Sequence, residues 1–272
     1  MFKKHALFLC VLLLACNCIA QNTILQRLYN DTASIRSIAT LDSSNYMLAG
    51  YKDVQNQARG FLMMVDSVGK PKWTKYLFDT LNLGSSGNVI NGTFRLKAIS
   101  NNRFLLTGGT SYGFGVGQGH AFILIVDTSG TILKSKKFTA PGITVPIYDA
   151  IENSDGTFAV CGSYITQNWF FFPIADALLA KLDSNLSVIW AKTYSKQEGD
   201  KALHIAASPD NTYILQVSTQ DTIYTNCQTL LYKVDTAGSL IWAKESGDTS
   251  LVVPFGQWYT SNIPTNCVLL VK

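Results

Sequence analysis

The stretch Asp155-Gly-Thr-Phe-Ala-Val-Cys-Gly162 decides the fold of this 272-residue chain, because its layout recurs along the sequence. A polar turn is followed by an apolar run that begins with an aromatic residue. The four aromatic residues, called the lead residues below, are Tyr46, Phe104, Phe158 and Tyr213. They are 58, 54 and 55 residues apart. A nearly constant period of this size indicates a repeat protein in which each copy is one supersecondary unit.

Each copy continues with a second apolar run that ends in aspartate, then a tight turn and a last run. The aspartates are Asp66, Asp127, Asp183 and Asp235. Aspartate at the first position of a turn caps its own backbone, so we predict a structural role for these residues rather than a calcium site. The last run carries Trp73, Trp190 or Trp242, which we expect to pack between copies. Leu186 replaces the turn glycine in the third copy, and Lys134 replaces the tryptophan in the second.

Four β-like runs in each copy, separated by turn signals, predict one four-stranded antiparallel sheet per copy. Such a sheet is apolar on both faces, and stacking the copies around an axis buries those faces. No stretch keeps helical periodicity long enough to compete. The chain is therefore predicted to be an all-β β-propeller of four-stranded antiparallel blades, with four complete copies and a partial fifth. The predicted copies span about 35–79, 93–140, 147–196 and 202–248, with the partial copy at 249–272.

The N-terminal segment predicts export. Two lysines precede an apolar run from Ala6 to Ala15, and small residues then lead to Ala20. This order is typical of a secretory signal peptide, so we expect residues 1–20 to be removed and 21–272 to form the repeat domain. The apolar run is too short to span a bilayer. The rival interpretation is a lipobox that ends at Cys16, which would make the exported protein a lipoprotein.

The best-formed copy resembles the repeat of a known family. Its three runs, Asp155–Gly162, Ala177–Asp183 and Ile189–Tyr194, are similar to the repeat of secreted bacterial β-propeller proteins of the Bacteroidetes type. The resemblance covers about residues 22–272. It implies the propeller architecture and export to the periplasm, the cell surface or the medium. It implies little about activity, because one scaffold hosts many functions.

The two ends of the repeat domain predict how the ring of blades closes. Residues 22–31 align with an outermost strand, and in closed propellers such a strand completes the last blade. The run from Pro264 to Val271 aligns with the run from Pro209 to Gln216, so the fifth copy stops after its second strand. Two interpretations stay open. Either the fifth blade closes irregularly, or the sequence is part of a longer protein, which is the interpretation we favour.

Composition excludes some classes of partner. Charged residues make up 15% of the chain, and two lysines of the +4 net charge lie in the leader, so no basic patch for nucleic acid is expected. The cysteines outside the leader are Cys161, Cys227 and Cys267, with neither a CxxC pair nor a histidine at metal spacing. We therefore expect no metal and no cofactor. Cys161 is predicted to be a buried apolar residue of a strand.

Two functions from different classes remain open. The first is an exported, non-catalytic binding or surface-scaffold module for a glycan or protein partner. The second is an exported glycan-active hydrolase, whose chemistry needs two carboxylates about 5–10 Å apart at the propeller channel. Its candidate carboxylates are Asp149, Asp176 and Glu198. Because the mature chain has two histidines in different copies and lacks the G-x-S-x-G and H-E-x-x-H patterns, we favour the first function and assign no catalytic residue.

The connections between second and third strands, and between copies, are long and differ in every copy, so binding is expected on the face that they share. The candidate ligand-binding residues are Trp169, Phe170, Phe171, Phe172, Tyr112, Phe114 and Tyr224. The strand after the aromatic run is expected to start near Ala177. A strand hides only every second side chain on one face, so part of the run would form an exposed apolar contact surface. The alternative is that the aromatic cluster closes the mouth of the channel.

Overall fold

The structure is a computed structural model that describes residues 33–54, 57–77, 95–110, 120–138, 145–169, 172–196, 199–220 and 227–245. The chain divides into two compact units, Met1–Asp31 and Thr32–Lys272, and every described residue belongs to the second. The predicted leader, the lone strand at 22–31 and the partial copy at 249–272 lie outside the described residues.

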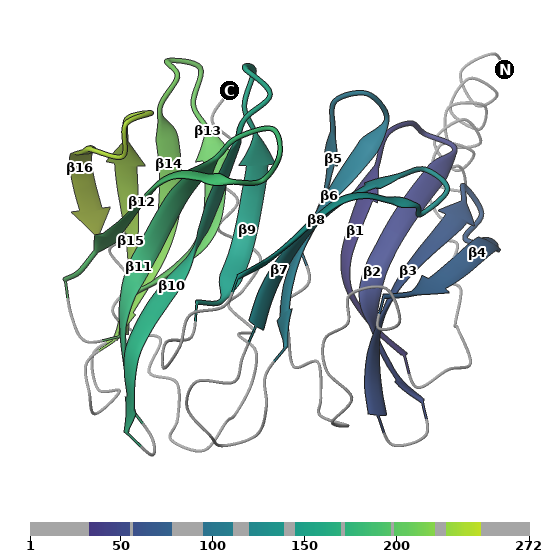
Figure 1. Ribbon diagram of the computed structural model, residues 1–272, viewed down its shortest axis with the longest axis horizontal. Coiled ribbons are helices and arrows are strands. Elements are labelled where there is room, and N and C mark those ends of the chain that lie inside the picture. Colours follow the sequence, from purple (N-terminus) through teal and green to yellow (C-terminus); the bar gives the residue numbers. More distant parts are fainter. Residues whose placement is uncertain are drawn as a thin grey trace, which may run out of the picture. The chain divides into compact units, whose positions relative to one another are not determined.

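Within these residues, sixteen strands form four antiparallel sheets, and each sheet pairs its four strands in chain order (Figure 1). We call the sheets blades 1 to 4. Blade 1 contains β1 (Ala33–Thr40), β2 (Asn45–Val54), β3 (Gln57–Asp66) and β4 (Pro71–Tyr76). Blade 2 contains β5 (Arg95–Ile99), β6 (Arg103–Thr110), β7 (His120–Asp127) and β8 (Ile132–Phe138). Blade 3 contains β9 (Ile147–Glu152), β10 (Phe158–Trp169), β11 (Phe172–Leu182) and β12 (Val188–Tyr194). Blade 4 contains β13 (Lys201–Ala207), β14 (Tyr213–Gln220), β15 (Cys227–Val234) and β16 (Leu240–Glu245).

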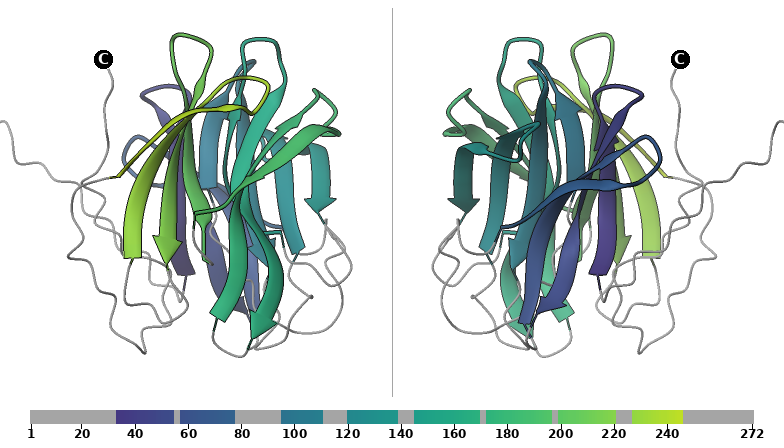
Figure 2. Two further views of the ribbon diagram at one scale, coloured as in Figure 1. Left: turned by 90° about the vertical axis from the view of Figure 1, so that its left-hand side faces the viewer. Right: turned by 90° about the vertical axis from the view of Figure 1, so that its right-hand side faces the viewer.

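The blades stack face to face in chain order, as the two views of Figure 2 show, and an apolar cluster lies between each consecutive pair. Alternate side chains of a strand point to opposite faces, so one strand serves two interfaces. In β6, Phe104 and Leu106 join the cluster with blade 1, whereas Leu105 joins the cluster with blade 3. In β10, Val160 packs toward blade 2 and Cys161 toward blade 4. The described part of the chain is therefore a β-propeller of four-stranded antiparallel blades, as predicted.

Cys161 is fully buried and forms no disulfide. Burial raises the pKa of its thiol well above the ordinary value, so the thiol stays protonated and apolar. The interpretation of Cys161 as a core residue is confirmed.

The turn between the third and fourth strands confirms the predicted role of the four aspartates. In blade 2, Asp127 Oδ1 accepts hydrogen bonds from the backbone nitrogens of Ser129 at 2.8 Å and Thr131 at 2.9 Å. The corresponding aspartates of the other blades accept equivalent pairs of backbone hydrogen bonds; they are Asp66, Asp183 and Asp235. Among the described residues, no three histidine, cysteine, aspartate or glutamate residues lie close enough to hold a metal ion.

A tryptophan of one blade packs on the turn glycine of the next blade. A Cβ atom added at Gly130 of blade 2 would lie 2.6 Å from the Trp73 ring of blade 1. A Cβ atom added at Gly238 of blade 4 would lie 2.9 Å from the Trp190 ring of blade 3. The glycine therefore makes room for the ring, and the predicted packing between copies is confirmed for these two tryptophans.

The interface between blades 2 and 3 is built differently. Here Lys134 stands in place of the tryptophan, and its Nζ donates a hydrogen bond to the Ser184 carbonyl oxygen at 2.6 Å. Leu186 stands in place of the glycine and is fully buried in the apolar cluster. The two exceptions in the sequence repeat thus lie on the two sides of one interface.

We expect Gly238→Ala to destabilise the protein more than Gly156→Ala. The backbone φ is 80° at Gly238 and 76° at Gly156, so both substitutions carry a similar conformational cost of about 1 kcal/mol. The new methyl group meets the Trp190 ring only at Gly238, since nothing lies within 4 Å of a Cβ atom at Gly156. Overpacking of this kind adds about 1–3 kcal/mol. Urea unfolding of both variants measures the difference, and equal losses would contradict the tryptophan–glycine contact.

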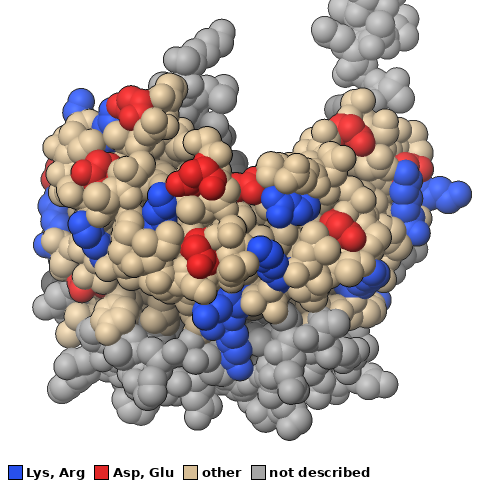
Figure 3. Space-filling model, turned by 45° about the horizontal axis from the view of Figure 1, so that its top comes forward, with Lys and Arg blue, Asp and Glu red and all other residues tan. Residues whose placement is uncertain are grey.

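The outer strands carry lysines beside the tryptophans. The Nζ atoms of Lys75, Lys192 and Lys244 lie 5.8, 6.0 and 5.2 Å from the ring centres of Trp73, Trp190 and Trp242. Charged side chains on an edge strand discourage pairing with a strand of another molecule. On the face in Figure 3, basic and acidic side chains are interspersed. No helix in the described part of the chain is long and apolar enough to cross a membrane.

Candidate functional site

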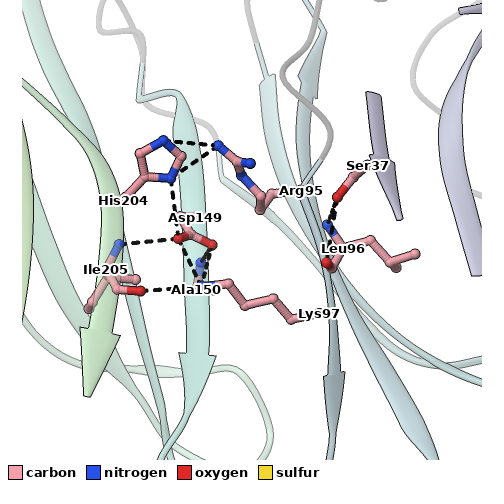
Figure 4. Close-up of polar contacts among 8 residues, drawn as sticks. All are labelled: Ser37, Arg95, Leu96, Lys97, Asp149, Ala150, His204 and Ile205. Atoms are coloured by element: carbon pink, nitrogen blue, oxygen red, sulfur yellow. Dashed lines mark hydrogen bonds and ion pairs between the residues drawn. The ribbon is translucent and has the colours of Figure 1, made fainter. Parts of the chain in front are cut away.

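The first strand of every blade carries a polar residue at one equivalent position. These residues are Ser37, Arg95, Asp149 and His204, and we call them the axial ring. Each lies nine residues before the lead residue of its blade and pairs with the third residue after that lead residue. The first strands of consecutive blades contact one another, so the ring residues gather at the centre of the blades. Figure 4 shows them with their partners.

A β-bulge directly precedes the ring residue in blades 1, 3 and 4. The extra residues are Arg36, Tyr148 and Leu203, which have no residue opposite them on the second strand. A bulge bends its strand and redirects the side chain that follows. In blade 2, the strand begins at the ring residue Arg95 itself. The backbone therefore sets the direction of this position, in addition to the register.

The residue after the ring residue is apolar in every blade. Leu96, Ala150 and Ile205 belong to the cluster with the preceding blade and are 3%, 2% and 3% exposed. The equivalent residue of blade 1, Ile38, is 59% exposed. The first strands of blades 2, 3 and 4 thus alternate between a polar side chain at the centre and an apolar one against the preceding blade.

Asp149 has the most polar contacts of the axial ring. Its side chain is 3% exposed, and Lys97 Nζ lies 2.8 Å from each of its carboxylate oxygens. The backbone nitrogens of Ala150 and Ile205 donate to the same carboxylate at 2.9 and 3.1 Å. Burial opposes ionisation, but His204 and Lys97 outweigh it and hold the pKa of Asp149 below its ordinary value. Asp149 is therefore an ionised group that joins blades 2, 3 and 4.

Arg95 and His204 point toward each other from blades 2 and 4 (Figure 4). One guanidinium nitrogen of Arg95 lies 3.0 Å from Nδ1 and 3.1 Å from Nε2 of His204. Nδ1 of His204 is 3.8 Å from Asp149 Oδ2, and the imidazole side chain is 41% exposed. Arg95 is half-buried, and no carboxylate of the described residues lies within ion-pair distance of it. The site thus offers an unbalanced guanidinium and an accessible imidazole beside a neutralised carboxylate.

Ser37 connects the ring to the adjoining blade. Its hydroxyl accepts a hydrogen bond from the Leu96 backbone nitrogen at 2.9 Å and lies 3.5 Å from the Leu96 carbonyl oxygen. The hydroxyl is therefore engaged with the backbone of blade 2. Ser37 positions the first strands of blades 1 and 2 relative to each other.

Of the three carboxylates predicted to face the channel, Asp149 lies in the axial ring. Asp176 lies in the third strand of blade 3, opposite Tyr164, so it is not on a first strand. Glu198 lies outside the described residues. The other carboxylate of the described first strands is Glu152, which accepts hydrogen bonds from Ser100 and Arg103 and so belongs to the neighbouring turn.

The predicted aromatic contact segment is a hairpin rather than a loop. β10 runs to Trp169, β11 begins at Phe172, and these two residues pair. The prediction that the following strand starts near Ala177 is therefore wrong, because aromatic residues favour extended strands and the pairing continues through them. Only the backbone of Trp169 and Phe172 is described. Their role as ligand-binding residues stays a prediction, as does that of Phe170, Phe171, Tyr112, Phe114 and Tyr224, which lie outside the described residues.

A cleft of about 230 Å³ opens between blades 1 and 2, away from the axial ring. Trp73 and Phe104 supply apolar lining, and Asp42 and Asn45 supply polar lining. Asp42 Oδ1 accepts hydrogen bonds from the backbone nitrogens of Ser44 and Asn45 at 2.6 and 2.8 Å. These polar groups serve the turn between β1 and β2, so we place the candidate site at the axial ring instead.

No family model matches this chain, and no curated protein matches it in sequence. Solved structures match its fold. A xylan β-1,4-xylosidase from Bacillus halodurans is 14% identical with a TM-score of 0.50, and the match covers 85% of this chain and 45% of the xylosidase. An endo-arabinase from Bacteroides thetaiotaomicron is 13% identical with a TM-score of 0.48, covering 81% of this chain and 82% of the arabinase.

A third match is itself described as a β-propeller domain. It belongs to the trilobed protease from Pyrococcus furiosus, is 11% identical with a TM-score of 0.44, and covers 82% of this chain and 59% of that domain. At these identities, similarity extends to the fold and not to an activity.

Proposed function

We propose that this chain is an exported, glycan-active propeller that binds its ligand at the axial ring. The observation that carries the proposal is the ring itself. It brings a guanidinium, a carboxylate and an imidazole together at one register position of the first strands. Sugars offer many hydroxyl groups that both donate and accept hydrogen bonds, and a few converging polar groups in an apolar scaffold are typical of a small-ligand site. Asp149 also joins the blades, whereas the apolar clusters between blades contain neither Arg95 nor His204.

Hydrolysis is the first form that this function takes. The solved structures of similar fold include a xylosidase and an endo-arabinase, which favours glycan chemistry over a purely structural role. Asp149 is ionised, as a base or nucleophile of a glycosidase must be. The partner carboxylate would come from outside the described residues, where Glu198 is the candidate. In a hydrolase, Asp149 and Glu198 would form the catalytic pair of carboxylates.

Binding without chemistry is the second form, and a specific observation supports it. Lys97 and two backbone nitrogens already contact the carboxylate of Asp149, and its side chain is only 3% exposed. A carboxylate in this setting serves best to orient its neighbours. His204, which is 41% exposed, would then be the group that meets the sugar.

The two forms are separated by one experiment on the whole exported protein. Oligosaccharides of xylose, arabinose, mannose and fructose are tested for binding by calorimetry and for release of reducing sugar. Binding that His204→Gln weakens by about tenfold or more, while Arg36→Gln leaves it unchanged, supports the axial site. Arg36 is an exposed residue next to the ring that stacks on Tyr51, so it is a matched control. Sugar release marks a hydrolase, and binding alone marks a binding module.

The proposal also includes export of the protein and its kinship with secreted propeller proteins. The leader predicts cleavage after Ala20, and the repeat resembles the secreted Bacteroidetes-type propellers. The mass of the exported protein tests this. A chain that begins at Gln21 supports the signal peptide, and a lipid-modified Cys16 would replace it with the lipoprotein interpretation.

A further inference from the structure

We propose that the axial ring recognises an acidic sugar, with Arg95 and His204 binding the carboxylate of a uronic acid. This inference rests on the proposed glycan ligand and adds the charge of that ligand. It follows from the charge balance at the ring, from the geometry of Arg95 and from the accessibility of His204.

Among the described residues, the charge balance at the ring is positive. Lys97 and Asp149 neutralise each other at 2.8 Å. Arg95 remains, and its partner among the described residues is the imidazole of His204 rather than a carboxylate. Removing a guanidinium from water without a counter-charge is costly, and a bound anion removes that cost. The ring therefore favours a ligand with one negative charge.

The geometry favours a carboxylate over other anionic groups of a sugar. A guanidinium is a planar fork of donors that matches the two oxygens of a carboxylate. A neutral imidazole keeps one N–H donor, and both ring nitrogens of His204 lie 3.0–3.1 Å from the guanidinium nitrogen. A carboxylate in contact with both side chains would accept hydrogen bonds from blades 2 and 4 at once. The hydroxyl groups of the same sugar ring would then lie among the remaining polar groups of the ring.

His204 is the side chain through which solvent and ligand reach this position. Its side chain is 41% exposed, whereas Asp149 is 3% exposed, so the imidazole is the solvent-facing member of the pair. Asp149 Oδ2 lies 3.8 Å from Nδ1 of His204 and helps to orient the imidazole. Asp149 is thus a positioning residue, and Arg95 and His204 are the binding residues.

Calorimetric titration of the whole protein tests the inference with matched ligands. The probes are trisaccharides of galacturonic, glucuronic and mannuronic acid, and the methyl ester of each, which keeps the sugar and removes the charge. We expect at least one acid to bind at least about tenfold more tightly than its ester. Arg95→Gln should weaken that binding about 10- to 100-fold, and Arg36→Gln should not change it. The melting temperature of Arg95→Gln should not fall, because the substitution removes an unbalanced charge.

Each other outcome overturns the inference. An ester that binds as tightly as its acid shows that the charge is not recognised. An acid whose affinity is unaffected by Arg95→Gln binds elsewhere. Acetate that competes as well as the trisaccharide shows a site for any small carboxylate. Binding of neutral oligosaccharides without binding of any acid overturns the inference and leaves the proposed glycan function in place, whereas absence of all binding overturns both.

Discussion

Asp149→Ala is expected to lower the free energy of unfolding by about 3 kcal/mol. Removing one partner of a buried ion pair costs about 3–5 kcal/mol, because the other charge stays in the protein without compensation. Lys97 is 32% exposed, so the lower end of that range applies. The substitution also leaves the backbone nitrogen of Ile205 without its acceptor. Urea unfolding measures the loss.

Two variants control this result. The double variant Lys97→Met, Asp149→Leu removes both charges and should recover most of the loss, since apolar replacements of a buried pair are often neutral. Glu245→Ala breaks an exposed pair with Lys196, and its effect should stay below about 1 kcal/mol. A loss at Asp149 no larger than that at Glu245 would mean that the ion pair at the ring does not stabilise the fold.

The pH dependence of the free energy of unfolding in acid should depend on the same carboxylate. The folded-state pKa of Asp149 lies below its ordinary value, so its ionisation stabilises the fold above about pH 4. That contribution is lost as the pH falls below about 4 and through the folded pKa. The pH dependence of stability in this window should be weaker in Asp149→Asn than in the unchanged protein.

Gly162→Ala is expected to cost about 3 kcal/mol or more. A Cβ atom at Gly162 would lie 2.0 Å from the Pro146 carbonyl oxygen and 3.1 Å from the Ile147 Cα atom. Both are backbone atoms, and the Pro146 oxygen accepts a hydrogen bond from the Ser163 nitrogen at 3.1 Å, so neither moves without breaking the start of β9. Overpacking against rigid atoms costs about 1–3 kcal/mol and more where nothing yields.

The matched control is Gly199→Ala. Its added Cβ atom would meet the side chain of Gln220 at 2.4 Å, and that side chain can turn aside. A loss of about 1 kcal/mol or less is expected there. Thermal or urea unfolding of both variants gives the comparison. Similar losses would show that β9 shifts easily past Gly162, which would contradict the expected clash with the Pro146 carbonyl oxygen.

The fold was predictable because each copy repeats signals that have a local physical cause. Asp127 caps its turn through contacts two and four residues away, and alternation of Phe104, Leu105 and Leu106 sends side chains to two interfaces. Both causes act within one blade and can be read from the chain directly. Even the exceptions, Lys134 and Leu186, were visible, although their placement on one interface needed the stacking of the blades.

The axial ring was harder to predict for a physical reason. The nine-residue offset from the lead residue was present, but the bulge at Tyr148 breaks the alternation that would have shown which side of β9 faces inward. Asp149 was named as a candidate carboxylate of the channel, and the structure places it in the axial ring. Arg95 and His204 were not named, because neither belongs to a motif and their proximity arises only when blades 2 and 4 are placed beside blade 3. The prediction that the aromatic run forms a loop was wrong, because strand pairing continues to Trp169.

The exposure of Ile38 has a consequence for motion. Leu96, Ala150 and Ile205 each pack a first strand against the blade before it, whereas no described residue covers Ile38 at the same position of blade 1 in this way. In an array coupled through nearest neighbours, a unit held on one side opens at a lower free energy than a unit held on both. Amide hydrogens of β1 should therefore exchange with deuterated water sooner than those of β5 and β9. Exchange should be slowest in β5 and β9, where Arg95 and Asp149 lie, because blades 2 and 3 have a described neighbour on both sides.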